Sequence, residues 1–199
     1  MLISPRLEEL IKALNGLPGI GRKTAQRLAW YLLSADAEIA TDLAKTIVDA
    51  VQSYAPCGVC NLISESDPCP LCASADRDDS QLCIVENSGD VHILENMNEY
   101  RGRYYVLGHL LSPLDGYGPE ELGIPKLMEL LAERKPTELI LALKPTAEGE
   151  ATIHYLTQIF TEISINITRL STGIPFGGEL EYSSALTLAN AWNRRYSVQ

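Results

Sequence analysis

Residues 55–74 read APCGVCNLISESDPCPLCAS and carry four cysteines in two C-x2-C pairs, eight residues apart: Cys57, Cys60, Cys69 and Cys72. Each pair can turn two thiolates toward one point, and two such pairs complete the closed tetrahedral sulfur shell that structural Zn2+ prefers. The spacing therefore predicts a structural zinc knuckle within residues 55–79. No coordination position stays open in such a shell, so we expect the metal to stabilise rather than to catalyse.

Disulfide bonds or free thiols are the alternative for these four cysteines. Met1 opens into a polar segment rather than a signal peptide, so we expect a cytoplasmic protein whose thiols stay reduced. No apolar run approaches the roughly 20 residues that span a bilayer, so no membrane association is expected. Cys83 lies in the apolar run LCIV and is predicted to be a buried strand residue rather than a ligand.

The charge of the chain is unevenly distributed. The 199 residues are 46% hydrophobic, which suits one ordinary core plus small modules, and they carry a net charge of -10. That net charge alone argues against a nucleic-acid partner, because phosphate binding needs basic surface. However, residues 1–35 hold five basic and two acidic side chains, a net +3 that leaves -13 for the remainder. One end is therefore basic, and nucleic acid remains a candidate partner.

The basic end is predicted to form two short helices joined by a glycine-rich turn. Apolar residues recur at helical spacing in 7–14 and in 25–32, on either side of LPGIG at 17–21. Gly19 and Gly21 allow backbone geometries that a side chain would block. Their amides, together with the start of the following helix, can bind a phosphate group.

Three basic residues follow the turn: Arg22, Lys23 and Arg27. Lys23 and Arg27 are four residues apart and share a helix face, where they can add phosphate contacts. The pattern resembles the helix-hairpin-helix motif of DNA-binding proteins that lack sequence specificity. A helical hairpin whose basic residues are only solvated is the alternative.

A third helix is predicted over residues 36–54. Its apolar residues share one stripe: Ile39, Leu43, Ile47 and Val51. We expect this stripe to pack against the hairpin, so that residues 1–54 form one helix-hairpin-helix region. The acidic stretch 76–79, after the cysteines, is expected to be a hinge.

The rest of the chain alternates between strand-like and helix-like segments. Short apolar runs occupy 82–85, 104–107, 139–143 and 165–170. Helical stretches occupy 124–133 and 150–162. This alternation predicts a mainly parallel sheet covered by helices, so the fold class is α+β in several modules: the hairpin, the cysteine knuckle, an α/β domain and a short C-terminal helical segment.

In such a sheet, function gathers at the carboxyl ends of the strands. Glu86 follows one strand, and Glu148 and Glu150 follow another in an E-G-E sequence. This pattern resembles the Toprim fold, in which a strand-end glutamate and a later D-x-D-x-E-G-E hold Mg2+. Lys144 and Thr146 take the places of the two aspartates, and a lysine there would repel a metal ion. We therefore expect no metal-dependent catalysis and assign no catalytic residue.

Five motifs in order resemble the RecR family of bacterial recombination mediators. They are LPGIGRK at 17–23, the four cysteines, SPLDGYGP at 112–119, PTAEGEAT at 145–152 and GIPFGGELEY at 173–182. The resemblance covers essentially the whole chain. It implies a Toprim domain over 80–175 and a C-terminal segment over 176–199 that is Walker B-like and takes part in assembly.

The resemblance also implies a function. Members of this family are non-enzymatic, zinc-containing, DNA-binding factors of recombinational repair that form homodimers or tetrameric rings. They act with RecO and RecF to help load RecA onto single-stranded DNA. Lys23 and Arg27 would contact DNA, and Glu86, Glu148 and Glu150 would dock RecO or RecF. The expected location is the nucleoid in the cytoplasm.

Three positions depart from the family pattern. Lys144 stands where Asn is usual, His109 where Gly is usual, and Ser184 where an acidic residue is usual. Lys144 makes the acidic patch less negative, and His109 brings an imidazole near Asp115. Two other functional classes remain open: a Mg-dependent Toprim enzyme such as a primase or nuclease, and an adaptor that binds only proteins.

Overall fold

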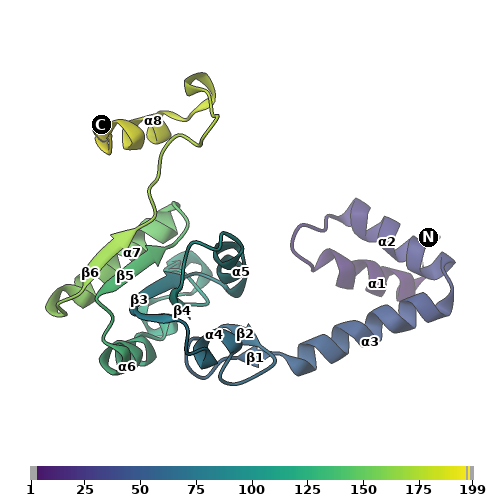
Figure 1. Cartoon of the computed structure of the whole chain (residues 1–199). Coiled ribbons are helices and arrows are strands. Elements are labelled where there is room, and N and C mark those ends of the chain that lie inside the picture. The colour runs from purple at the N-terminus through teal and green to yellow at the C-terminus, as the bar shows by residue number, and fades with distance from the viewer. Residues whose placement is uncertain (1–3, 196, 198–199) are drawn as a thin grey trace. The chain divides into compact units, whose positions relative to one another are not determined.

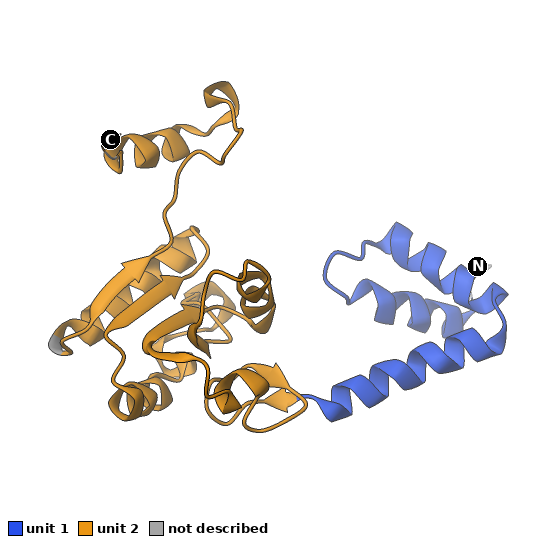
Figure 2. Ribbon diagram, in the orientation of Figure 1, with its two compact units in different colours: residues 1–54 blue, residues 55–199 orange. Residues whose placement is uncertain are grey.

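In the computed structural model, which describes residues 4–195 and 197, the chain forms two units (Figure 2). The first contains residues 1–54 and the second residues 55–199. A parallel sheet, the cysteine cluster and a C-terminal helix all belong to the second unit. The predicted α+β class with a parallel sheet is confirmed.

The first unit is all helical: α1 (Pro5–Asn15), α2 (Arg22–Ser34) and α3 (Ala37–Ser53) (Figure 1). The Ser4 hydroxyl accepts a hydrogen bond from the Leu7 amide at 3.4 Å, which starts α1. The helices α1 and α2 share a buried core of Leu7, Ile11, Ala25 and Ala29. The two alanines are fully buried, and their small side chains let the helices approach closely.

The helix α3 has the predicted extent but not the predicted packing. No residue of α3 is buried. Its apolar stripe is exposed by 45% at Ile39, 47% at Leu43, 55% at Ile47 and 74% at Val51. The expectation that this stripe packs against the hairpin is therefore wrong. The hairpin closes its core with α1 and α2 alone, and among the described residues none of the α3 stripe belongs to that core.

The second unit begins with a small hairpin of β1 (Ala55–Pro56) and β2 (Ile63–Ser64), followed by the short helix α4 (Pro70–Ala73). The main sheet then forms from β3 (Asp78–Val85), β4 (Gly102–Val106), β5 (Glu138–Ala142) and β6 (Asn166–Arg169). Its strand order is β4-β3-β5-β6, and every pair is parallel.

Four longer helices accompany these strands: α5 (Ser88–Asn96), α6 (Ile124–Arg134), α7 (Ala147–Ile159) and α8 (Ala185–Asn193). Short 3-10 turns lie at Pro113–Asp115, Pro119–Leu122, Phe160–Glu162 and Leu180–Tyr182. The helix α5 was not predicted. The helix α7 begins before the predicted start at 150, because the Thr146 hydroxyl caps it by accepting from the Gly149 amide at 3.2 Å.

The two faces of the parallel sheet bury different partners. Alternate residues of β3 point to opposite faces, so Leu82 and Ile84 join the side chains of α6 and α7. Cys83 and Val85 join α5 together with Leu62 and Leu71 of the cysteine module. Cys83 is therefore the buried strand residue that the sequence predicted. The cysteine module is thus part of the cover of one face of the sheet.

The acidic stretch 76–79 was predicted to be a hinge, but its last two residues belong to a strand. Asp78 and Asp79 are the first residues of β3. The Asp79 carboxylate accepts from Arg103 at 2.8 Å and from Arg134 at 3.1 Å. These ion pairs fix the start of the strand. Among the described helices, none is long and apolar enough to cross a membrane.

Candidate functional site

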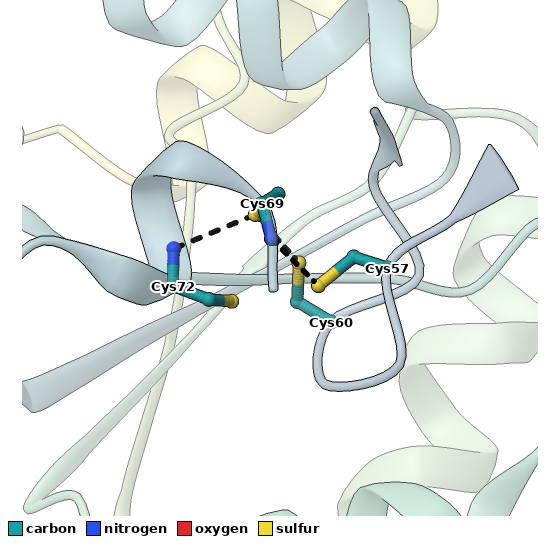
Figure 3. Close-up of side chains that lie close together, drawn as sticks. All are labelled: Cys57, Cys60, Cys69 and Cys72. Atoms are coloured by element: carbon teal, nitrogen blue, oxygen red, sulfur yellow. Dashed lines mark hydrogen bonds between the residues drawn. The ribbon is translucent and has the colours of Figure 1, made fainter. Parts of the chain in front are cut away.

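The four predicted ligand cysteines come together (Figure 3). Cys57 and Cys60 flank the turn between β1 and β2, while Cys69 caps α4 and Cys72 lies within it. Their sulfur atoms all lie within 4.8 Å of one another, and the Sγ atoms of Cys60 and Cys69 are 3.6 Å apart. Tetrahedral sulfurs around Zn2+ are about 3.8 Å apart, given Zn–S bonds of about 2.3 Å. The donor set and its spacing therefore fit a closed metal site.

Backbone amides donate to two of the four sulfur atoms. The amide of Cys69 donates to the sulfur of Cys57 at 3.3 Å, and the amide of Cys72 donates to the sulfur of Cys69 at 3.4 Å. Burial opposes ionisation of Cys57, yet the amides around its sulfur lower the pKa of this thiol to about 7. Burial raises the pKa of Cys69 to about 11. Metal binding would thus have to displace protons from some of these thiols.

The glycine-rich turn leaves the start of α2 open. Gly19 has a φ of +78°, a conformation that favours glycine, and an added Cβ at Gly19 or Gly21 would meet no atom within 4 Å. Gly21 is the N-cap of α2 and offers no side chain to its first amides. No side chain caps these amides, so an anion could bind to them.

The basic residues beside the turn differ in their engagement. The guanidinium of Arg22 donates to the Glu8 carboxylate at 3.0 Å, although its side chain remains 70% exposed. Lys23 and Arg27 are both exposed, and neither forms an ion pair with a described residue. Lys23 and Arg27 are therefore more available for phosphate than Arg22 is.

The carboxyl ends of the strands bring only two of the three predicted glutamates together. Glu86 and Glu148 line one cavity of about 200 Å3, together with Lys144, His109 and Asp115. The ammonium of Lys144 donates to Glu86 at 3.0 Å, and this ion pair raises the pKa of Lys144. The lysine that the sequence placed among the carboxylates is therefore bound to one of them.

Glu150 turns away from this cavity. Both of its carboxylate oxygens accept from the guanidinium of Arg169, at 2.8 and 2.6 Å, and these bonds lower the pKa of Glu150. Gly149 between the glutamates is required for a close approach, because an added Cβ would clash with the carbonyl oxygen of Lys144. In the described part of the chain, the three glutamates do not form a group close enough to share a metal ion.

The loop after β4 adds aromatic residues to the same edge. The rings of His109 and Tyr117 stack with centroids 4.0 Å apart, and Ser112 donates to Asp115 at 2.6 Å. The buried Thr152 of α7 fixes this loop, since its hydroxyl accepts from the Leu111 amide at 2.9 Å. His109 and Asp115 line one cavity, as the sequence suggested, but the ring of Tyr117 is the stacking partner of the imidazole.

A second cavity of about 730 Å3 adjoins the strand ends. It also has Glu86 and Lys144 in its wall, and it is bounded by α5, the ends of β5 and β6, and α8. Apolar side chains contribute to its wall, including the exposed Ile93 and Leu186. Ser184 caps α8, because its hydroxyl accepts from the Thr187 amide at 3.1 Å.

Comparisons with known proteins decide the family. The family described as "RecR, helix-hairpin-helix" matches residues 7–51, and the family described as "Toprim domain" matches residues 80–171. A "Recombination protein RecR" of Francisella tularensis subsp. tularensis (strain WY96-3418) is 43% identical over 197 residues, which are 99% of this chain and 98% of the relative. The chain belongs to the RecR family. A "Recombination protein RecR" of Francisella tularensis subsp. novicida (strain U112) is also 43% identical over 99% of this chain and 98% of that relative.

The two family matches cover the two modules that hold the predicted DNA-binding and acidic residues. The helix-hairpin-helix match covers the turn with Lys23 and Arg27, and the Toprim match covers the strand-end glutamates. Sequence reasoning missed the cations that engage these sites: Arg169, which pairs with Glu150, and Arg103, which contacts the cysteine module. The sequence did not indicate either contact, because each arginine is distant in sequence from the group that it binds.

Proposed function

We propose that this chain is a non-catalytic, DNA-binding mediator of recombinational repair, which acts with RecO and RecF to help load RecA onto single-stranded DNA. The observation that carries the proposal is the pair of exposed cations, Lys23 and Arg27, beside the open start of α2 in a RecR-family chain. Such a site holds phosphate and reads no bases, so DNA binding is expected at any sequence.

Zn2+ in the four-cysteine site has a structural role in this proposal. Cys57, Cys60, Cys69 and Cys72 would hold the ion in a shell without an open position. The modules then comprise the hairpin region 1–54, the zinc module 55–79, the Toprim domain 80–175 and the C-terminal segment 176–199.

Assembly into a dimer or a tetrameric ring would supply the affinity for DNA. A few phosphate contacts per subunit bind weakly, and several subunits on one strand bind far more tightly. The exposed apolar stripe of α3 supports assembly, because large contiguous apolar faces mark protein interfaces. A ring that is basic only at the hairpins would hold DNA while its acidic remainder repels phosphate.

Glu86, Glu148 and Glu150 are the proposed docking residues for RecO or RecF. Glu148 is the most available of the three, because Lys144 holds Glu86 and Arg169 holds Glu150. The same ion pairs support a role without catalysis: a clustered set of free carboxylates is what a Toprim enzyme needs for Mg2+.

The direct test is RecA loading. RecA filament formation on single-stranded DNA coated with its binding protein should accelerate when this chain, RecO and RecF are added together. Lys23→Glu should reduce the acceleration and the double variant Lys23→Glu, Arg27→Glu should lose it. Lys45→Glu on α3, the charge-matched control for Lys23→Glu, should retain it. Equal activity of the double variant would favour an adaptor that binds only proteins, and DNA cleavage in Mg2+ would favour an enzyme.

A further inference from the structure

We propose that Arg103 and Lys126 are positioning residues that fasten the metal module to the edge of the parallel sheet and thereby slow the loss of its metal. The inference rests on the zinc site proposed above. Arg103 lies on β4 and Lys126 on α6, so both belong to the domain beneath the module and neither is a ligand.

Arg103 holds the second cysteine pair. Its side chain is only 11% exposed, and its Nη1 donates to the carbonyl oxygens of Leu71 at 2.7 Å and Cys72 at 3.1 Å. Its Nε donates to Asp79 at 2.8 Å. The planar guanidinium is thus fixed by a carboxylate on one side and by the backbone of a ligand residue on the other.

Lys126 holds the first cysteine pair. Its ammonium donates to the Asn61 side-chain oxygen at 2.5 Å and to the carbonyl oxygen of Cys57 at 3.4 Å. Asn61 has a φ of +62° and follows Cys60 directly, so it belongs to the ligand turn itself. Each C-x2-C pair therefore receives one cation from the underlying domain.

The metal module also covers the edge of the sheet. β4 is the outermost strand, and its outer side would otherwise be open to other chains. The Val106 amide donates to the Cys60 carbonyl at 2.8 Å, and the Asn61 amide group donates to the Val106 carbonyl at 3.0 Å. The cavity left between module and sheet, beside Arg103, is only about 10 Å3. The ligand turn therefore continues the hydrogen bonding of β4.

The net charge of a zinc-loaded site also favours two cations beside it. A Zn2+ ion held by four thiolates carries about two net negative charges. One guanidinium and one ammonium, each bonded to the backbone of a ligand residue, offset that charge where the module meets the sheet. Outer-shell partners of this kind typically contribute about 10-fold to 100-fold to metal affinity.

The experiment measures zinc transfer from the full-length protein to a chromophoric chelator. Arg103→Gln and Lys126→Met should each bind zinc about 10-fold more weakly than wild type and release it correspondingly faster. Arg134→Gln is the matched control, because Arg134 pairs with the same Asp79 at 3.1 Å and has no hydrogen bond to the module among the described residues. It should release zinc at the wild-type rate. Hydrogen exchange at Val106 should also accelerate in zinc-loaded Arg103→Gln.

Several outcomes would overturn the inference. Unchanged zinc release in both variants would do so, and if Arg103→Gln does not fold, an unchanged rate in Lys126→Met is sufficient. Equal acceleration in Arg134→Gln would assign the effect to the start of β3 instead. Wild-type protein purified without zinc would contradict the zinc proposal itself, whereas zinc-loaded protein with unaffected variants would contradict only the positioning role.

Discussion

The Nζ of Lys144 lies 3.0 Å from a carboxylate oxygen of Glu86, at the carboxyl ends of β5 and β3. The lysine side chain is 51% exposed and the glutamate 21%, so the pair sits at the mouth of the cavity rather than within it. Because Lys144 neutralises Glu86, the surface offered to a basic partner is less negative than three glutamates suggest. Glu148 and Asp115 are the other two carboxylates in the wall of this cavity.

Lys144→Ala should therefore strengthen the binding of a basic partner such as the proposed RecO, by a few-fold at low salt. Little stability should be lost, because exposed ion pairs contribute little. Titration calorimetry with the purified partner measures the change. Lys135→Ala, at the end of α6, is the control. Weaker binding in Lys144→Ala would contradict this account.

Charge reversal at Lys23 or Arg27 should weaken DNA binding equally at every sequence tested. Each lost phosphate contact should also reduce the slope of log K against log salt by about 0.7 to 0.9. Fluorescence anisotropy over a range of salt concentrations measures both effects. Zinc content and assembly should not change, and Lys45→Glu should behave as wild type. A loss confined to some sequences would show base readout instead.

Zinc retention should fall as the pH is lowered. Protons compete with the metal for the thiolates, and the pKa of about 7 at Cys57 together with the raised pKa of Cys69 places that competition at and above neutral pH. Chelator competition at pH 6 and pH 8 should show weaker binding at pH 6. Cys57→Ser should lower both zinc content and the unfolding temperature, whereas Cys83→Ser should leave zinc content unchanged. Equal affinity at both pH values would argue against thiolate ligands.

Replacing Val51 by Asp on the stripe of α3 should reduce assembly without unfolding the subunit. Val51 is 74% exposed, so a charge there costs the isolated subunit little, but it would be costly in an apolar interface. Light scattering should report a smaller mass at equal concentration. Asp49→Ala on the same helix is the control. An unchanged mass would place the assembly surface elsewhere.

The pair of Arg77 and Glu95 should make stability depend on acid pH. Arg77 is 9% exposed and Glu95 27%, and hydrogen bonding to Arg77 lowers the pKa of Glu95. A carboxyl with a lowered folded-state pKa contributes its full stability above the unfolded value of about 4.3, and this contribution is lost as the pH falls through the folded pKa. Glu95→Gln should cost about 2 kcal/mol at pH 7, less than a fully buried pair.

Urea unfolding at neutral and acid pH checks this prediction. The difference between wild type and Glu95→Gln should shrink below about pH 4, where the wild-type carboxylate also gains a proton. A difference that stays constant across the range would mean that the glutamate contributes through packing alone.

Local patterns predicted the elements well. The four parallel strands lie near the predicted runs because strands buried on both faces read as continuous apolar segments. The helix α5 was missed because it is short and follows β3 almost directly. The cysteine cluster was predictable from spacing alone, since two close pairs leave little freedom.

Long-range partners were not predictable in the same way. Glu150 appeared to belong with Glu86 and Glu148, but Arg169 at the end of β6 pairs with it. The stripe of α3 had the periodicity of a packed helix, and periodicity does not reveal whether the partner face belongs to the same chain. Arg103 and Lys126 gave no signal, because their contacts join segments that only the fold brings together.

The salt dependence of DNA binding by the wild-type protein, with light scattering on the same sample, tests the proposed DNA-binding role directly. Single-stranded and gapped oligonucleotides in Mg2+ report binding and integrity together. We expect binding that falls steeply with salt, tracks a multimeric species and leaves the DNA intact. No binding at low salt, or cleavage of the DNA, would contradict it.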